Sequence, residues 1–170
     1  MGAPQRSRRE TPAPARASAR RGRSAGGDGT GVAAGGAAGV AAAAFAVEAA
    51  RMAHDDKCED VVLLDVRGLS QVTDYIIVAS GTSDRQMRSV LNHVRGMGDS
   101  MGYGLFRSNS DDRATWLLAD FVDVVVHIFE PNTRAHYDLE MLWGDAKRIP
   151  WERPADAARN RAGLRKGDGV

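Results

Sequence analysis

The chain has 170 residues, 43% of them hydrophobic, with 23 basic against 22 acidic side chains, which fits one soluble domain plus additional segments and argues against two domains. The charge is uneven: residues 1–40 carry a net +5, residues 41–150 carry −6 and residues 151–170 carry +2. An acidic middle argues against a nucleic-acid-binding body, because phosphate neutralisation needs clustered Lys and Arg. Cys58 is the only cysteine, which excludes an internal disulfide and favours a reducing compartment.

Residues 1–40 are predicted to be a disordered extension, because 22 of them are Ala, Gly or Pro and none is aromatic. The uncharged run 31–47 is too short and too poor in large aliphatic side chains for a membrane span. Seven arginines and few acids are also typical of an organellar transit peptide. We favour an extension of a bacterial, cytoplasmic protein over organellar import.

The first half of residues 41–150 predicts a helix, two strands and a second helix. Apolar side chains at helical spacing around Phe45 indicate the first helix, and the aliphatic run 60–66 is expected to be a buried central strand. The run 75–80 predicts the next strand. Thr82 or Ser83 is expected to cap a helix that stops at Gly102.

The second half predicts three strands and a last helix. Residues 105–107 form a short strand in this interpretation, and 108–113 form a polar turn. The runs 115–121 and 123–129 are close enough to form an antiparallel hairpin. Asn132 or Thr133 is then expected to cap one helix that ends at Gly144. The order α-β-β-α-β-β-β-α predicts an α/β fold with a mixed sheet packed by helices.

Catalytic motifs are weak in this sequence. The stretch S-G-T-S at 80–83 joins a strand to a helix and could hold an anion, but it lacks both glycine-rich phosphate fingerprints, so we interpret it as a capped turn. The sequence has no pair of strand carboxylates one residue apart that would hold two metal ions. We therefore expect no catalytic residues, no metal and no cofactor.

Two aromatic side chains in the predicted hairpin are candidates for binding. Alternation places His127 on one sheet face with Phe129, while Val126 and its neighbours line the other. His127 lies at no recognised ligand spacing to the other histidines, which favours a hydrogen-bonded histidine in a core or interface. Trp116 is either a half-buried core residue or the anchor of an interface, and the sequence favours neither.

The motifs T-D-Y at 73–75, S-G-T-S at 80–83, D-V-V-V-H-I-F at 123–129 and R-A-H-Y-D-L-E-M-L-W at 134–143 occur in one series. With this series the chain closely resembles the Iojap family of ribosomal silencing factors over residues 41–145. The resemblance implies a nucleotidyltransferase-like fold without catalytic residues. It also implies binding to large-subunit ribosomal protein fourteen, a block of subunit joining, repression of translation under nutrient limitation, and a homodimer in the free state.

Nine residues fall on the family's recurring positions: Asp74, Trp116, Asp120, Asp123, His127, Arg134, Tyr137, Glu140 and Trp143. The resemblance implies that all of them except Trp143 bind the partner. Family members often have Tyr-Gly before the D-V-V-V-H motif, where this chain has Phe121–Val122. Residues 41–150 are predicted to be the family domain, and 151–170 a flexible tail. The N-terminal arginines are candidates for contact with ribosomal RNA. The alternative function is a residual nucleotide-binding or nucleotidyltransferase enzyme.

Overall fold

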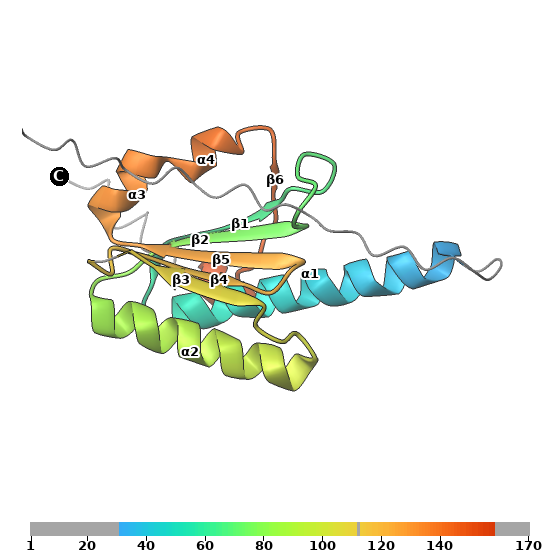
Figure 1. Cartoon of the computed structure of the whole chain (residues 1–170), viewed down its shortest axis with the longest axis horizontal. Coiled ribbons are helices and arrows are strands. Elements are labelled where there is room, and N and C mark those ends of the chain that lie inside the picture. The colour runs from blue at the N-terminus through green and yellow to red at the C-terminus, as the bar shows by residue number, and fades with distance from the viewer. Residues whose placement is uncertain (1–30, 112, 159–170) are drawn as a thin grey trace, which may run out of the picture. The chain divides into compact units, whose positions relative to one another are not determined.

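The computed structural model describes residues 31–111 and 113–158. Within them, six strands form one sheet in the order β3-β4-β5-β2-β1-β6, with helices on both faces (Figure 1). The predicted α/β fold with a mixed, helix-packed sheet is confirmed. In chain order the elements are α1 (Gly31–Asp55), β1 (Glu59–Asp65), β2 (Tyr75–Ser80), α2 (Asp84–Met101), β3 (Arg107–Ser110), β4 (Trp116–Asp120), β5 (Val124–Phe129), α3 (Pro131–Tyr137), α4 (Leu139–Leu142) and β6 (Lys147–Arg148).

Helix α1 begins at Gly31, inside the segment that the sequence analysis assigned to the extension. Alanine has the highest helix propensity, so an Ala-rich stretch continues a helix beyond the part that packs. Among the described side chains, burial begins at Ala42, whereas Val40 is 72% exposed. The core therefore starts near the predicted boundary although the helix does not. The predicted disorder of residues 1–30 lies outside the described residues.

The parallel pair β2 and β5 forms the centre of the sheet. Tyr75 lies opposite Val124, and every residue of β2 is buried. The prediction that 60–66 is the central strand is wrong, because β1 lies between β2 and the two-residue β6 and starts with exposed residues. A short aliphatic run does not reveal its position in a sheet. The predicted antiparallel pairing of β4 with β5 is confirmed.

Helices α1 and α2 cover one face of the sheet, here called the helix face (Figure 1). Phe45 of α1 is fully buried there, stacked on Tyr103 at a centroid distance of 4.7 Å and edge-on to Phe121 at 5.0 Å. The predicted ends of α2 are confirmed: the Ser83 side chain accepts a hydrogen bond from the Gln86 amide, and Gly102 has a left-handed φ of 83°. This face holds most of the buried apolar side chains.

The opposite face, here called the open face, carries α3 and α4 (Figure 1). The prediction of one last helix is wrong, because Asp138 with φ of 44° separates α3 from α4. Aspartate tolerates this left-handed conformation, and its carboxylate accepts a hydrogen bond from the Met141 amide at 3.3 Å. The predicted cap is also displaced, since α3 starts after Glu130 with Pro131 in its first turn. The break lets Leu139 and Trp143 pack on the sheet.

Two further boundaries differ from the predictions. Strand β3 occupies 107–110, most of which was predicted to be a polar turn, because pairing with β4 stabilises a strand that has no apolar side chain. Trp151 was assigned to a flexible tail but is buried, and its Nε1 donates a hydrogen bond to the Val61 carbonyl at 3.0 Å. Chain packing therefore extends through Trp151. None of the helices in the described residues is long and apolar enough to cross a bilayer.

Candidate functional site

Four rings form a cluster where α3 crosses the ends of β4 and β5 on the open face. Tyr137 lies 4.7 Å from Trp116 and 6.2 Å from Phe129, measured between ring centroids. Trp116 lies 5.1 Å from Phe129 and 5.8 Å from His127. We call these four residues the aromatic cluster. Phe129 is fully buried, Trp116 is half-buried and Tyr137 is 50% exposed, so the cluster runs from the core to the surface.

His127 is held in its neutral form within this cluster. It is 9% exposed, and Trp116 Nε1 donates a hydrogen bond to its Nδ1 at 3.2 Å. Burial lowers the pKa of His127 from 6.5 to about 4, and the nearby Asp120 carboxylate acts in the opposite direction. The acceptor role of Nδ1 requires the tautomer with hydrogen on Nε2. His127 is therefore a hydrogen-bonded buried histidine, as its isolation in the sequence indicated.

The turn before β4 positions Trp116. Asp111 accepts hydrogen bonds from the Thr115 hydroxyl at 2.7 Å and from the Trp116 backbone amide at 2.9 Å. Burial acts to raise the pKa of Asp111, but the hydrogen bonds that its carboxylate accepts lower the pKa by more, so the net shift is downward. An ionised Asp111 thus fixes the start of the strand that carries the tryptophan.

An ion pair lies beside the cluster, where α3 and α4 meet the end of β2. Arg134 is paired with Glu140 and also donates a hydrogen bond to the Ser80 hydroxyl at 2.8 Å. The side chains of both partners are largely buried, at 13% and 20% exposed. This pairing ties the two short helices to the sheet and leaves the Arg134 guanidinium little freedom to contact another molecule.

The turn at 80–83, which was considered as an anion site and interpreted as a capped turn, is filled by the protein's own side chains. Ser83 caps α2, and Gln86 Oε1 accepts hydrogen bonds from both the amide and the hydroxyl of Thr82. A Cβ atom on Gly81 would lie 2.2 Å from Met87 Cγ, so a side chain fills the space above the glycine. The interpretation as a capped turn fits this geometry.

The eight predicted binding residues do not form one site. The structure brings Trp116, His127 and Tyr137 together, with Arg134 and Glu140 alongside. Asp120 lies on the same face at the far end of β4, where Arg107 donates a hydrogen bond to its carboxylate at 3.2 Å. Asp74 and Asp123 lie at the opposite end of β2 and β5, where the Asp123 carbonyl accepts the Asp74 amide at 3.0 Å. Those two residues connect the starts of the central strands.

Sequence reasoning missed several members of this surface. Phe129 belongs to the aromatic cluster, and the alternation that placed it beside His127 was the available signal. Arg107 was missed as a partner of Asp120, because the register of β3 was displaced in the prediction. Met141 and Leu142 of α4 are 79% and 70% exposed, which the prediction of one continuous helix ending at Gly144 did not indicate.

No group of three or more potential metal ligands occurs among the described residues. Cys58 is buried, and burial raises the pKa of its thiol to about 11, with the Asp56 charge adding to the effect. A protonated, buried thiol is a poor nucleophile.

Comparison with known proteins shows the family of the chain. The model of the family described as "Ribosomal silencing factor during starvation" matches residues 41–167. The chain belongs to the ribosomal silencing factor family. It is 39% identical over 98 residues to the ribosomal silencing factor of Bacillus subtilis, covering 58% of this chain and 83% of that protein. It is 36% identical over 115 residues to the chloroplastic protein Iojap of Zea mays, covering 68% and 49% respectively.

Solved structures agree with the fold. A crystal structure of a Chromobacterium violaceum protein has a TM-score of 0.54 and 35% identity, covering 61% of this chain and 83% of that one. A crystal structure of a Bacillus halodurans protein has a TM-score of 0.52 and 31% identity, covering 64% of this chain and 95% of that one. Membership in the family confirms the resemblance seen in the motifs and assigns the silencing factor a ribosome-associated, regulatory role.

Proposed function

We propose that this silencing factor binds ribosomal protein fourteen of the large subunit through the aromatic cluster, blocks subunit joining and represses translation when nutrients are limited. Bacterial relatives named as ribosomal silencing factors support this activity in the bacterial cytoplasm. The observation that carries the proposal is that the aromatic cluster reaches the surface on the only sheet face that α1 and α2 leave uncovered in the described residues.

The composition of this surface suits protein recognition. Tryptophan and tyrosine contribute most strongly to interface energies, particularly at the centre of a contact. Tyr137 and the neighbouring Met141 and Leu142 expose apolar area that a partner would bury. The acidic body, at −6 over residues 41–150, complements a basic ribosomal protein and favours rapid association.

The eight predicted binding residues divide into roles in this proposal. Trp116 and Tyr137 contact the partner, while His127 supports Trp116 by accepting its hydrogen bond. Arg134 and Glu140 position α3 through their pairing. Asp120 forms the charged margin of the surface with Arg107. Asp74 and Asp123 are assigned to the strand connection rather than to the partner.

We propose that the protein is not an enzyme, in preference to the residual nucleotidyltransferase. The three hydroxyls of the 80–83 turn are engaged, because Ser80 accepts from Arg134, Thr82 donates to Gln86 and Ser83 caps α2. The Asp120 carboxylate already accepts hydrogen bonds from Arg107 and from the Val122 amide. Phosphoryl transfer depends on carboxylate-held cations that this arrangement does not supply. A homodimer in the free state is also part of the proposal, with the exposed apolar side chains of α4 as its natural contact.

Co-sedimentation with purified large subunits tests the proposal. Trp116→Ala and Tyr137→Ala should each weaken binding by about 2 kcal/mol, or roughly thirtyfold. Phe106→Ala is the matched control, because Phe106 is a 69% exposed aromatic outside the cluster. Melting temperatures separate binding from folding, since Trp116 is partly packed whereas half of Tyr137 is in solvent. A stable Tyr137→Ala protein that binds normally, or wild-type protein that ignores the subunit, would contradict the proposal.

A further inference from the structure

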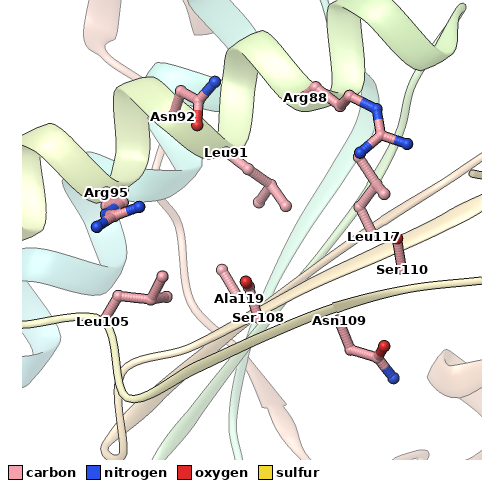
Figure 2. A pocket seen from close by; sticks show the side chains of 10 residues that line it. All are labelled: Arg88, Leu91, Asn92, Arg95, Leu105, Ser108, Asn109, Ser110, Leu117 and Ala119. Atoms are coloured by element: carbon pink, nitrogen blue, oxygen red, sulfur yellow. The ribbon is translucent and has the colours of Figure 1, made fainter.

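A groove of about 390 Å³ lies between α2 and strands β3 and β4, on the helix-face side of the sheet (Figure 2). Helix α2 packs over β4, and β3 is the edge strand beside β4, so the groove lies along an edge of the sheet. The apolar floor comes from Leu91, Leu105, Leu117 and Ala119. The polar lining comes from Arg88, Asn92, Arg95, Ser108 and Ser110, and from Asn109 at the β3 edge, whose side chain points away from α2 (Figure 2).

Hydrogen-bond donors dominate the polar lining, and it contains no carboxylate. Arg88 and Arg95 project from α2 at the two ends of the part of this helix that lines the groove (Figure 2). Seven residues of helix separate them, which is about 10 Å along the axis. Arg88 is paired with Asp84 at 2.6 Å, whereas Arg95 makes no ion pair within the described residues. At least one guanidinium is thus available to an anion.

The edge of β3 adds further donors. The Asp111 amide donates to the Trp116 carbonyl, and the antiparallel register then turns the backbone amides of Ser108 and Ser110 away from β4. The side chains of these two serines face the groove, because Ser108 pairs with Ala119 and Ser110 with Leu117, both on the helix face. Two hydroxyls and two free amides therefore line the open side.

The charge of the domain is distributed unevenly around this groove. Residues 84–120 contain five Arg and five Asp, so the whole net charge of −6 resides in the other residues of 41–150. The overall composition argued against nucleic-acid binding, but it did not show that tertiary structure places two of these arginines in one carboxylate-free groove. The stretch of chain that forms the groove therefore carries no excess negative charge.

We propose that this groove binds the phosphate backbone of an RNA strand of the large ribosomal subunit. The inference rests on the proposed function, because docking through the open face would bring the β3 edge to the margin of the contact. At this edge Arg107 and Asn109 lie on the open face, and Ser108 and Ser110 lie on the helix face. Arginine, hydroxyl and backbone amide donors recognise phosphates without reading sequence. The separation of about 10 Å between Arg88 and Arg95 along the axis of α2 corresponds to about three nucleotides of a stacked strand.

Salt titrations of subunit binding test this assignment with the full chain. Arg95→Gln should reduce the slope of log K against log salt by about 0.7–0.9, the value for one lost phosphate contact. Arg85→Gln is the matched control, because it removes the same charge from the same helix but does not line the groove. The arginines of residues 1–40 contribute equally to all variants. Equal slopes for the two variants would overturn the proposal.

A second measurement does not depend on the ribosome. An oligouridylate of about twelve nucleotides, added to the labelled full chain, should shift the NMR amide signals of residues 88–95 and 108–110. An oligoglutamate of the same charge should not compete. If the peptide shifts these signals and the RNA does not, the groove binds acidic peptides and the RNA proposal is wrong.

The two proposals fail in different ways. If Tyr137→Ala loses binding while Arg95→Gln keeps the salt dependence of the wild type, docking through the aromatic cluster is supported. The same result overturns the proposal that the groove binds RNA. Wild-type protein that does not sediment with large subunits would overturn the docking proposal. In that case the oligouridylate titration still decides whether the groove takes RNA.

Discussion

The two faces of the sheet differ in what they bury, although the same strands supply both. On the helix face Val124, Val126 and Ile128 are fully buried under α1 and α2. On the open face the alternate positions of the same strand hold His127 and Phe129, which are buried against the half-buried Trp116 and the half-exposed Tyr137. A period of two along one strand thus separates a closed apolar core from a partly open aromatic surface.

This separation implies that stability and recognition can be changed independently. Side chains that are fully buried on the helix face contribute mainly to the free energy of unfolding, since a partner cannot reach them. Exposed side chains of the open face contribute mainly to binding. The predictions below test this division, from the largest expected effect to the smallest.

The largest effect is expected on the helix face. Phe45→Ala removes a fully buried ring and its contacts with Tyr103 and Phe121, so it should lower the free energy of unfolding by about 3–5 kcal/mol. Urea denaturation measures this loss. Subunit binding by the folded fraction should be unchanged. A stable Phe45→Ala protein with weakened binding would contradict the separation of the two faces.

The buried histidine on the open face should make the protein sensitive to acid. The folded pKa of about 4 lies below the ordinary 6.5, so the unfolded chain binds a proton first and stability falls as the pH drops from 6.5 to 4. His127 should account for about 3 kcal/mol of the free energy of unfolding that is lost over this pH range. His127→Gln should remove it, which a comparison of unfolding free energies at several pH values would show. Parallel pH profiles for the two proteins would argue against a neutral, buried His127.

The C-terminal contact should have a smaller effect. Trp151→Phe keeps most of the ring packing but loses the hydrogen bond from Nε1 to the Val61 carbonyl, which should cost about 1 kcal/mol. Thermal or urea denaturation would detect it. An unchanged midpoint would mean that the tail assignment was right and that Trp151 does not contribute to the packed domain.

The smallest expected effect is a gain in stability at the turn between β4 and β5. Val122 has φ of 75°, and the Asp123 amide donates a hydrogen bond to the Phe121 carbonyl across it, which is the geometry of a strained γ-turn. Val122→Gly removes a strain of about 1–2 kcal/mol and adds about 0.5–1 kcal/mol of backbone entropy cost.

The net gain for Val122→Gly should therefore be about 0.5 kcal/mol, measured as a higher urea midpoint. Gly102→Ala is the reciprocal control, because it places a side chain at φ of 83° and should destabilise the protein. A loss of stability in Val122→Gly would show that the Val122 side chain contributes more than its backbone strain costs.

Local sequence patterns were sufficient for the elements with strong periodicity or specific caps. The spacing of apolar residues located the packed part of α1, and Ser83 and Gly102 marked the ends of α2. Alternation assigned His127 and Val126 to opposite faces, because side chains along a strand point to opposite sides regardless of the rest of the fold. The motif series identified the family without the structure.

The structure alone decided the features that depend on contacts between distant segments. Strand β3 forms because β4 lies beside it, and Trp151 is buried because α1 and β1 provide its pocket. The break at Asp138 follows from the packing of α4 on the sheet, and the helical spacing of apolar residues in the sequence does not reveal that break.

The amino-acid sequence by itself determined the family, the α/β class and the face on which each residue of a regular strand lies, because periodicity and motifs are local properties of the chain. Only the tertiary structure decided which side chains meet. It joined Trp116 to Tyr137 across β4 and α3, separated Asp74 from Trp116, and placed Arg88 and Arg95 in a groove without carboxylates. Contacts of this kind depend on strand order, register and helix breaks, which result from the energy of the whole packed domain rather than from any single segment.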